Sequence, residues 1–389
     1  MSTKPVSSKV SDVQLAINAV ALLSPLTGIG QYTYHLISEL HQLLPRPPHL
    51  FYATSWSQEL RTTPLPHLDA FKRLAKRFLP RARLLSRLVQ QSHFSRGIKE
   101  RGIELYHEPN FLAFRYRGPS VVTVHDLSWV RHPETHPPER VRALQTMLPK
   151  VLAKADHILV DSEFVRGEVM THYGISGDRV SAVLLGVKPE FRPASALLCD
   201  AVLTPLQLTY GRYILAVGTL EPRKNLSSVL QAFALLPEAV RRHYPLVIAG
   251  GKGWGMAQFT ADVRQMIERG EVRLTGYVAQ DDLPLLYAGA RMLVYPSLYE
   301  GFGLPPLEAM ASGVPVISSN RASMPEVIGT AGVLLEPLDV NAISIQMQQL
   351  IEDVAYHQRL SVAGRARSLE FTWRQCALDT LAVYQKVLA

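Results

Sequence analysis

The sequence has little cysteine and no long apolar run. Its 389 residues include only two cysteines, Cys199 and Cys376, which cannot build a disulfide framework and match no zinc-ligand spacing. No window of about 18 uncharged apolar residues occurs, so a membrane-spanning helix is not expected. The opening residues, MSTKPVSSKVSD, lack the apolar segment of a secretory signal peptide. These absences favour a cytoplasmic protein, either free or resting on a membrane surface.

Size and composition are those of a two-domain globular chain. Hydrophobic residues make up 47% and charged residues 19% of the sequence, which excludes a disordered or fibrous protein. A chain of this length is expected to divide into two domains, because single domains commonly have roughly 100–200 residues.

The positive charge is concentrated in the first half. The formal net charge is +8, and residues 1–200 hold 25 Lys and Arg against 17 Asp and Glu, whereas residues 201–389 are balanced. Residues 71–101 combine leucines with one acid, Glu100, and ten basic residues: Lys72, Arg73, Lys76, Arg77, Arg81, Arg83, Arg87, Arg96, Lys99 and Arg101. This basic amphipathic stretch predicts an anionic membrane surface as partner, with a solvated helical face as an equal alternative. Nucleic acid is not expected, since the stretch lacks regular aromatic side chains for stacking bases.

Short β-branched runs alternate with longer helical segments in both halves, which predicts an α/β fold with parallel sheets. The proline-rich region 188–210 predicts a boundary between two Rossmann-like domains, 1–192 and 205–370, whose sheets face each other across a deep cleft. Residues 371–389 are expected to form a helix that packs back on the first domain. The expected strands are residues 13–20, 104–109, 120–126, 157–162, 212–218, 245–250, 272–276, 291–297 and 314–319.

In such sheets ligands bind beyond the carboxyl ends of the strands. The first candidate there is Gly28-Ile29-Gly30, a turn whose backbone amides could approach an anion. A dinucleotide-binding fingerprint has its third glycine at the position of Thr33. It also has an acidic residue about 20 residues further on that binds the ribose, and this sequence has none there. The turn therefore counts against a dehydrogenase.

The second candidate is the segment VGTLEPRKN, residues 217–225. Arg223 and Lys224 stand side by side after a strand and before a helix that we expect Asn225 to cap. A guanidinium, an ammonium and free amides form a clamp for a diphosphate. A charged surface turn is the alternative.

The third candidate is residues 296–319, where Glu300 and Glu308 flank a Gly-Phe-Gly turn. Two prolines, Pro305 and Pro306, predict a helix start that places Glu308 in or near the first turn. Carboxylates are good hydrogen-bond acceptors for the vicinal hydroxyls of a ribose or hexose. The alternative is that the two acids only stabilise the helix by facing the positive end of its dipole. The turn is expected to expose the amides of Phe302, Gly303 and Leu304.

The spacing Glu300-x7-Glu308 within YEGFGLPPLEAMASGVPVI resembles the retaining, nucleotide-sugar-dependent glycosyltransferases of family 4, which have the GT-B fold. VGTLEPRKN, the GIG turn and HDLSWVRHPE occur in the family's order. The resemblance covers the chain from about residue 13 to the C-terminal helix. It is closest to bacterial mannosyl- and rhamnosyltransferases of surface-polysaccharide synthesis of the O-antigen type.

The resemblance implies a role for each cluster. Glu308 would hold the donor ribose, and Glu300 would contact the hydroxyls of the transferred hexose. Arg223 and Lys224 would neutralise the leaving diphosphate. Backbone amides would bind the sugar and the diphosphate; the resemblance places these amides at Phe302, Gly303, Leu304, Gly28 and Gly30.

Four further positions follow from the same resemblance. Thr219 stands where some relatives have an additional arginine, and Tyr277 and Val278 stand where relatives pack the base. His125, at a strand end, would contact a hexose hydroxyl near the reacting carbon, with Asp126 orienting it or meeting the acceptor. Ser162 is more simply explained as a helix N-cap.

The expected reaction is metal-independent, since the sequence shows no DxD pair before a sugar site, and the resemblance implies transfer with retention of configuration. The favoured donor is a GDP-linked mannose or rhamnose, and the acceptor is a lipid-linked saccharide or polysaccharide at the inner face of the cytoplasmic membrane. No cofactor beyond the sugar nucleotide is expected. A nucleotide-sugar epimerase on the same fold and a nucleotide-sugar-binding scaffold are the alternatives.

Overall fold

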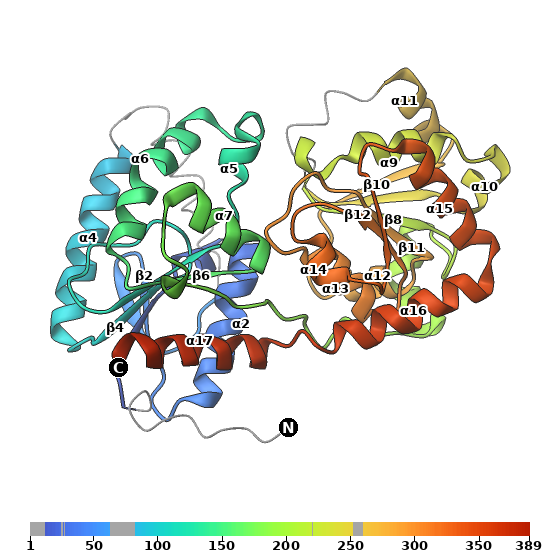
Figure 1. The fold of residues 1–389 in the computed structure, drawn as a ribbon. Coiled ribbons are helices and arrows are strands. Elements are labelled where there is room, and N and C mark those ends of the chain that lie inside the picture. The colour runs from blue at the N-terminus through green and yellow to red at the C-terminus, as the bar shows by residue number, and fades with distance from the viewer. Residues whose placement is uncertain (1–11, 25, 27, 63–81, 220, 252–259) are drawn as a thin grey trace. The chain divides into compact units, whose positions relative to one another are not determined.

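The computed structural model describes residues 12–24, 26, 28–62, 82–219, 221–251 and 260–389, and it folds them into two α/β units (Figure 1). Unit 1 draws its described residues from 1–127, 138–185 and 373–389, and unit 2 from 128–137 and 186–372. In each unit helices cover both faces of one sheet. The alternating pattern of the sequence correctly predicted this α/β class.

The sheet of unit 1 has the strand order β3-β2-β1-β4-β5-β6-β7, and all neighbours are parallel except β2 and β3. Its strands are β1 (Leu15–Asn18), β2 (His49–Tyr52), β3 (Ser55–Ser57), β4 (Leu105–Glu108), β5 (Ser120–Val124), β6 (His157–Val160) and β7 (Val180–Ala182). Its α-helices are α2 (Gly28–Leu43), α4 (Ala82–Glu100), α6 (Pro138–Lys154), α7 (Glu163–Tyr173) and α17 (Trp373–Leu388), with short 3-10 turns at Val20–Leu23 and Gly177–Arg179.

The sheet of unit 2 has the order β10-β9-β8-β11-β12-β13 and is parallel throughout. Its strands are β8 (Ile214–Val217), β9 (Leu246–Ala249), β10 (Val272–Gly276), β11 (Met292–Tyr295), β12 (Val316–Ser319) and β13 (Val333–Leu335). Its α-helices are α5 (Ser128–Arg131), α8 (Ala196–Leu203), α9 (Leu226–Ala234), α10 (Glu238–His243), α11 (Ala261–Glu268), α12 (Leu283–Ala288), α13 (Leu304–Ala311), α14 (Met324–Ile328), α15 (Val340–Glu352) and α16 (Val354–Ser368), with 3-10 turns at Pro133–Thr135, Thr204–Leu206 and Pro222–Lys224.

Strand order reverses once in each sheet, between β1 and β4 in unit 1 and between β8 and β11 in unit 2. At such a switch point the connections leave in opposite directions and open a crevice at the carboxyl ends of the strands. Polar residues that follow these four strands are therefore the ones the fold presents to a ligand.

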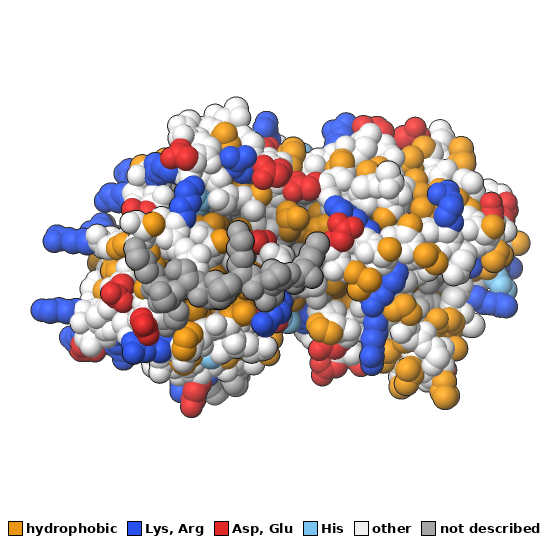
Figure 2. Space-filling model, turned by 60° about the horizontal axis from the view of Figure 1, so that its bottom comes forward, with side chains coloured by type: hydrophobic (Ala, Val, Ile, Leu, Met, Phe, Trp, Pro, Cys, Tyr) orange, Lys and Arg blue, Asp and Glu red, His pale blue; other side chains and the backbone are white. Residues whose placement is uncertain are grey.

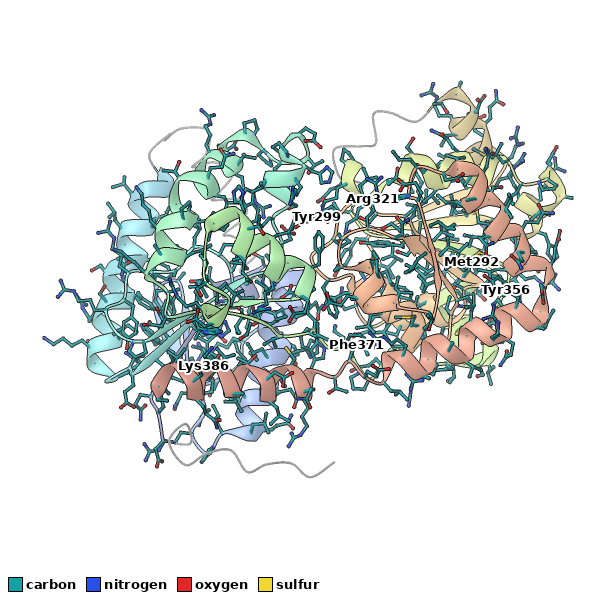
Figure 3. The ribbon with its side chains drawn as sticks, in the orientation of Figure 1. Met292, Tyr299, Arg321, Tyr356, Phe371 and Lys386 are labelled. Carbon is teal, nitrogen blue, oxygen red and sulfur yellow. The ribbon has the colours of Figure 1, made fainter. Side chains whose placement is uncertain are left out.

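The central strands are buried on both faces, as parallel strands between helical layers must be. β9 and β11 have no exposed residue, and Met292 of β11 is fully buried in the core of unit 2 (Figure 3). Phe233 of α9 and Met347 of α15 pack into the same cluster. The sheet is thereby held rigidly beneath the loops at its carboxyl edge.

The C-terminal helix α17 belongs to unit 1, where it packs against α2 (Figure 1). The Tyr384 hydroxyl lies 2.6 Å from His107 Nδ1, and His107 Nε2 lies 2.8 Å from the Thr123 hydroxyl. Burial lowers the pKa of His107 to about 3, so the ring is neutral and can donate through one nitrogen while accepting at the other. The network ties α17 to the middle of the sheet.

All the strands expected from the sequence are present, β10 with the expected bounds and the others with shorter ends. β2, β3, β7 and β13 were not predicted; β3, β7 and β13 have only three residues each, and β3 is polar. The glycine turn also differs from expectation: α2 begins at Gly28, so Gly28 and Gly30 lie in its first turn rather than before it. The first amides of a helix have no intrahelical acceptor, so this change leaves them available to an anion. Among the described helices none is both long and apolar enough to cross a membrane.

Candidate active site

Three charged side chains meet at the switch point of unit 2. The 3-10 turn Pro222–Lys224 follows β8, and Glu300 lies on the loop that follows β11. Arg223 donates to Glu300 Oε2 at 3.0 Å, and Lys224 Nζ donates to Glu300 Oε1 at 2.7 Å. The two cations that the sequence predicted as a diphosphate clamp are thus adjacent, and an internal carboxylate sits between them.

Glu300 is held by hydroxyls as well as by charge. Its Oε1 accepts from the Tyr295 hydroxyl at 2.8 Å and from the Ser297 hydroxyl at 2.7 Å, and only 8% of the residue is exposed. Burial alone would raise the pKa of Glu300, but the charges of Lys224 and Arg223 outweigh it and bring that pKa to about 2. The carboxylate is therefore ionised throughout the physiological range.

Backbone contacts join the same two loops. The amide of Leu298 donates to the Arg223 carbonyl at 2.8 Å, and the Ser297 hydroxyl, which donates to Glu300, lies 3.0 Å from the same carbonyl. The Arg223 guanidinium also donates to the Tyr299 carbonyl at 2.9 Å. The loop after β8 and the loop after β11 consequently form one rigid structure.

Asn225 contributes to this structure in a way the sequence did not predict. It precedes α9 in the left-handed conformation, with φ of 55°, and its side chain makes no capping bond to the helix. Asn225 Nδ2 instead donates to the carbonyls of Pro296 and Pro337, at 3.0 and 2.6 Å. The predicted side-chain cap is therefore wrong: asparagine tolerates the left-handed region, and its amide is used to bind neighbouring loops.

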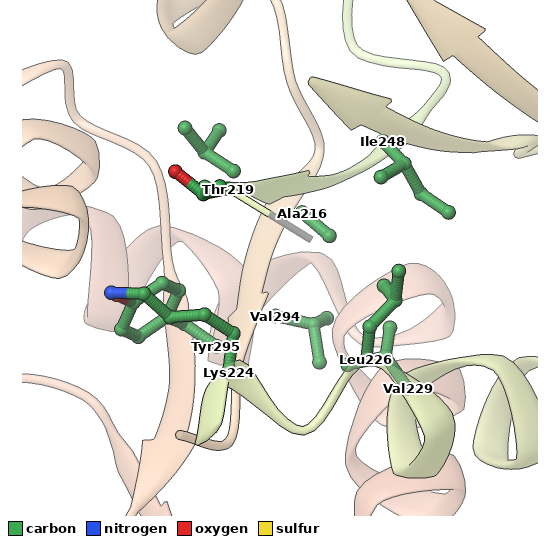
Figure 4. Close-up of a pocket in the computed structure, with 10 residues that line it drawn as sticks. Ala216, Thr219, Lys224, Leu226, Val229, Ile248, Val294 and Tyr295 are labelled. Carbon is green, nitrogen blue, oxygen red and sulfur yellow. The ribbon is translucent and has the colours of Figure 1, made fainter. Parts of the chain in front are cut away.

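A cavity of about 20 Å³ lies behind the clamp, between Lys224, Tyr295, Thr219 and apolar side chains of β8, β9 and α9 (Figure 4). The Lys224 ammonium lies 5.1 Å from the centre of the Tyr295 ring. This volume suits about one water molecule, so it is packing space beneath Lys224 rather than a place for a sugar. Thr219 itself is exposed.

The turn before α13 requires glycine. Gly303 has φ of 111°, and a Cβ there would approach the Met324 side chain to 2.2 Å. The Ser323 hydroxyl lies 2.9 Å from the Glu300 carbonyl and 2.8 Å from the Phe302 carbonyl, and by sharing its one proton between them it fixes the turn. Leu304 begins the helix, as the two prolines predicted. Pro305 and Pro306 have no amide hydrogen, and the Leu307 amide donates to the Gly303 carbonyl at 3.4 Å, so within this turn of helix it is the Leu304 amide that has no intrahelical acceptor.

Glu308 lies one turn into α13, just beyond the first turn. It is half-buried, and burial raises the pKa of Glu308 to about 7, because Tyr287 and Lys188 oppose the effect only in part. The Lys188 ammonium is held 3.3 Å from Gln280 Oε1. Beyond β10, Tyr277 is 65% exposed and Val278 is half-buried, and their assignment to a nucleotide base stays a prediction.

His125 follows β5 in unit 1 and is only 8% exposed. Its Nδ1 lies 2.8 Å from Asp161 Oδ2, and its Nε2 lies 2.8 Å from the Pro109 carbonyl. Because a carbonyl only accepts, Nε2 carries a proton. Burial opposes a charged ring, but Asp161 and the Pro109 carbonyl outweigh it and raise the pKa of His125.

The orienting carboxylate of His125 is thus Asp161 rather than the adjacent Asp126 that the sequence suggested. Both ring nitrogens are engaged, so contact of His125 with a sugar hydroxyl requires one partner to be displaced, and this contact stays a prediction. Ser162 is confirmed as a helix cap, since its hydroxyl accepts from the Val165 amide at 3.2 Å. The anion-binding role of the Gly28 and Gly30 amides also stays a prediction.

The sequence analysis missed Asp161, Tyr295 and Ser297. Each lies at the end of a strand or directly after it, on β6 or β11. The strand-end rule could have found Asp161 and Ser297, whereas Tyr295 reads as an ordinary core residue. Among the described residues no cluster of three or more His, Cys, Asp or Glu side chains is placed to hold a metal ion.

Substitution of Glu300 tests the competition between its carboxylate and a ligand diphosphate. Glu300→Gln should bind GDP or UDP at least as tightly as the wild type, because Arg223 and Lys224 lose their internal counter-charge. Arg223→Ala should bind about tenfold more weakly or worse, since removal of one partner of a buried charge pair commonly costs about 2–5 kcal/mol. Isothermal titration calorimetry measures both. Glu336→Gln, which breaks the exposed pair with Arg321, is the control, and lost binding in a folded Glu300→Gln protein would contradict the interpretation.

The raised pKa of Glu308 leads us to expect that the affinity for a nucleotide sugar depends on pH. An ionised carboxylate can accept from two ribose hydroxyls, and Glu308 ionises as the pH rises through about 7. Affinity for GDP-mannose or UDP-glucose should therefore increase about tenfold from pH 6 to pH 8. Glu308→Gln should bind weakly and independently of pH. Sugar nucleotides are the right probes, because their diphosphate has no terminal group that titrates in this range, and an identical pH profile in both proteins would refute the assignment.

Comparison with known proteins identifies the family. Residues 26–191 match the family described as Glycosyltransferase Family 4, and residues 208–367 match the family described as Glycosyl transferases group 1. The chain is 37% identical over 376 residues to O-antigen chain mannosyltransferase B of Escherichia coli. The match covers 93% of this chain and 96% of that protein.

Solved structures share the fold. Sucrose-phosphate synthase from Thermosynechococcus elongatus has a TM-score of 0.70 at 20% identity, covering 97% of this chain and 99% of that one. Alr3699/HepE of Anabaena, solved in complex with UDP and glucose, has a TM-score of 0.71 at 16% identity, covering 96% and 99%. The chain therefore belongs to the family 4 glycosyltransferases and has their GT-B fold of two Rossmann-like domains.

Proposed function

We propose that this glycosyltransferase transfers mannose from a nucleotide-diphosphate sugar, with GDP-mannose as the favoured donor, to a growing saccharide of the O-antigen type. Its 37% identity to O-antigen chain mannosyltransferase B over nearly the full length supports mannose as the transferred sugar and an O-antigen saccharide as the product. The observation that carries the chemistry is the cluster of Arg223, Lys224 and Glu300 at the switch point of unit 2. Rhamnose is the second candidate sugar, and family membership gives no support to the epimerase and scaffold alternatives.

Arg223 and Lys224 stabilise the departing diphosphate. Negative charge grows on the β-phosphate as the glycosidic bond breaks, and the two cations lie in a buried site where the attraction is poorly screened. The amide of Leu304, the first residue of α13, adds a donor from the segment that follows β11. Loss of one well-placed donor of this kind costs about 2.7–4 kcal/mol of transition-state stabilisation. With two fixed cations in place, we propose that the reaction needs no metal.

Glu300 exchanges partners when the donor binds. In the structure it neutralises both cations, so an incoming diphosphate takes over that role. The carboxylate then becomes available to accept from hexose hydroxyls, which is the part expected of it from the sequence. This exchange avoids leaving Arg223 and Lys224 unpaired in a buried site before the donor arrives.

The reaction proceeds with retention of configuration. The bond from the sugar C1 to the β-phosphate oxygen breaks, the acceptor oxygen bonds C1 from the same face, and the acceptor proton passes to the departing phosphate. An α-linked donor therefore gives an α-linked product. The diphosphate serves as leaving group and base, so the scheme requires no carboxylate nucleophile.

Nucleotide selectivity and product analysis test the proposal. GDP, UDP, ADP and TDP are compared by thermal shift, since a ligand at 100 times its dissociation constant stabilises the native state by about 2.7 kcal/mol. GDP should stabilise the protein most, and GDP-mannose with mannotriose should give an α-linked product by NMR at an unchanged rate in EDTA. A UDP-selective response would replace the proposed donor, a β-linked product would refute retention, and loss of rate in EDTA would refute metal independence.

We also propose that α4 contacts the cytoplasmic face of an anionic membrane. Leu85, Leu88 and Val89 form a stripe on this helix and are 57%, 66% and 52% exposed. Figure 2 shows Lys and Arg side chains along the edge of unit 1 that carries α4. A helix with exposed leucines beside cations suits the interface between headgroups and acyl chains. Of the basic stretch predicted earlier, Lys72, Arg73, Lys76, Arg77 and Arg81 lie outside the described residues.

Vesicle sedimentation tests the role of the stripe. The wild type should bind vesicles of phosphatidylglycerol and phosphatidylcholine at low salt, and Leu85→Ser with Leu88→Ser should weaken partitioning about tenfold or more, because two apolar side chains no longer enter the interface. Leu197→Ser with Leu198→Ser is the matched control, since these leucines lie on α8 of unit 2 and are 85% and 62% exposed. Equal partitioning of the α4 variant and the wild type would exclude this contact.

A further inference from the structure

The two carboxylate oxygens of Glu300 have different kinds of partner. Oε1 lies within 2.8 Å of three donors, which are Lys224 Nζ and the hydroxyls of Tyr295 and Ser297. Oε2 accepts from the Arg223 guanidinium at 3.0 Å. A diphosphate competes with Glu300 for cations, so the contact that it can open is the one at Oε2, whereas the hydroxyls remain at Oε1. One oxygen of the carboxylate is therefore anchored and the other can be released.

Of the two hydroxyls at Oε1, that of Tyr295 has a fixed direction. It lies between Lys224 Nζ, at 2.5 Å, and Glu300 Oε1, at 2.8 Å. An ammonium only donates and an ionised carboxylate only accepts, so the tyrosine oxygen accepts from Lys224 and its single proton points to Glu300. The Ser297 hydroxyl has two carbonyl oxygens within 3.3 Å besides Glu300, so its proton has alternatives. Tyr295 is consequently the more constant anchor.

The sheet of unit 2 holds this tyrosine in place. Tyr295 is the last residue of β11 and is 2% exposed, and its carbonyl accepts from the Ser318 hydroxyl of the neighbouring strand β12 at 2.8 Å. Its side chain lies beside that of Lys224 at the small cavity beneath the clamp (Figure 4). Burial raises the pKa of the Tyr295 hydroxyl well above its usual value, and the charge of Glu300 adds to the effect. The hydroxyl therefore keeps its proton at physiological pH.

Packing alone does not account for a hydroxyl at this position. A phenylalanine would supply the same ring to the core, and a buried hydroxyl costs free energy unless it is hydrogen-bonded. The Tyr295 hydroxyl is bonded to two charged groups of the cluster and to both at once. It can thus keep Lys224 and Glu300 together after Arg223 has left the carboxylate.

We infer that Tyr295 is a positioning residue for glycosyl transfer, whose hydroxyl holds Glu300 Oε1 and Lys224 while the donor diphosphate draws Arg223 away from Oε2. The freed Oε2 is then the oxygen that accepts from the hydroxyls of the transferred hexose, and the anchored Oε1 sets its direction. Tyr295 acts through Glu300 and need not touch the donor. The inference rests on the proposed function, because it assigns an order to the exchange of partners proposed there.

Replacement of the tyrosine by phenylalanine tests the anchor by kinetics. Tyr295→Phe should bind GDP within about threefold of the wild type, because both cations remain, whereas kcat from GDP-mannose to mannotriose should fall about tenfold or more, because a hydrogen bond to a charged group is lost. Isothermal titration calorimetry and initial rates at saturating substrates measure the two effects. Tyr213→Phe is the matched control, since it removes a fully buried hydroxyl that donates to the Leu286 carbonyl, and its kcat should stay that of the wild type.

Three kinetic results would overturn the inference. The first is an unchanged kcat in Tyr295→Phe protein that circular dichroism shows to be folded. The second is an equal fall of kcat in Tyr213→Phe, which would show that loss of any buried hydroxyl in unit 2 has this effect. The third is a parallel loss of GDP binding and kcat in Tyr295→Phe, because the role assigned to Tyr295 concerns the hexose end of the donor.

A crystal structure of the wild type with GDP tests the exchange without relying on catalysis or on a variant. Arg223 should contact the diphosphate, Oε2 of Glu300 should have left Arg223, and Oε1 should remain about 3 Å from the Tyr295 hydroxyl. Release of Oε1 from Tyr295 would overturn the inference even if the enzyme transfers mannose normally. If GDP binds in the expected way but no nucleotide donor supports transfer, the proposed function fails and the anchoring of Glu300 by Tyr295 stands. If no nucleotide binds, both fail.

Discussion

The buried carboxylate of Glu300, between Arg223 and Lys224, is the interaction on which the site of unit 2 depends. Any of the three charges alone in this position would be strongly destabilising, whereas together they offset one another's loss of water. Their pairing also joins the loop after β8 to the loop after β11, and the contacts of the Leu298 amide and the Ser297 hydroxyl with the Arg223 carbonyl reinforce the junction. The cluster is consequently ordered without a ligand, so a donor that binds there as proposed would not have to orient it.

Strand order explains why chemistry gathers at two places in the chain. Each sheet has its first strand in the interior, so the connections diverge between β1 and β4 and again between β8 and β11. The divergence at β8 and β11 holds a cluster of two cations and one acid, which suits a diphosphate. The divergence at β1 and β4 holds the Asn18 amide and the Glu108 carboxyl group, which share a hydrogen bond and line a pocket larger than the cavity beneath Lys224. One topological rule thus yields two polar clusters of different charge in the two units.

The sequence predicted those features that depend on local patterns. Alternating apolar runs located the sheets, the two prolines located the start of α13, and the glutamate pair with the Arg-Lys dipeptide identified the family. It could not predict the partners that residues choose across the fold. Asn225 reads as a helix cap but binds the carbonyls of Pro296 and Pro337. His125 pairs with Asp161, which directly follows the neighbouring strand β6, rather than with the adjacent Asp126. Such pairings are decided by which strands are neighbours, and chain spacing does not record that.

The two glutamates of the family motif show how far environment, rather than residue type, sets function. Glu300 and Glu308 are eight positions apart and read alike in the sequence, yet the pKa of Glu300 is about 2 and the pKa of Glu308 is about 7. The first faces two cations and stays charged at every physiological pH, so it can act only as a counter-ion or an acceptor. The second faces a tyrosine and a distant lysine, so it gains or loses a proton near neutrality. If the donor binds as proposed, its diphosphate end meets a constant charge, while its ribose end meets a group whose charge follows the pH.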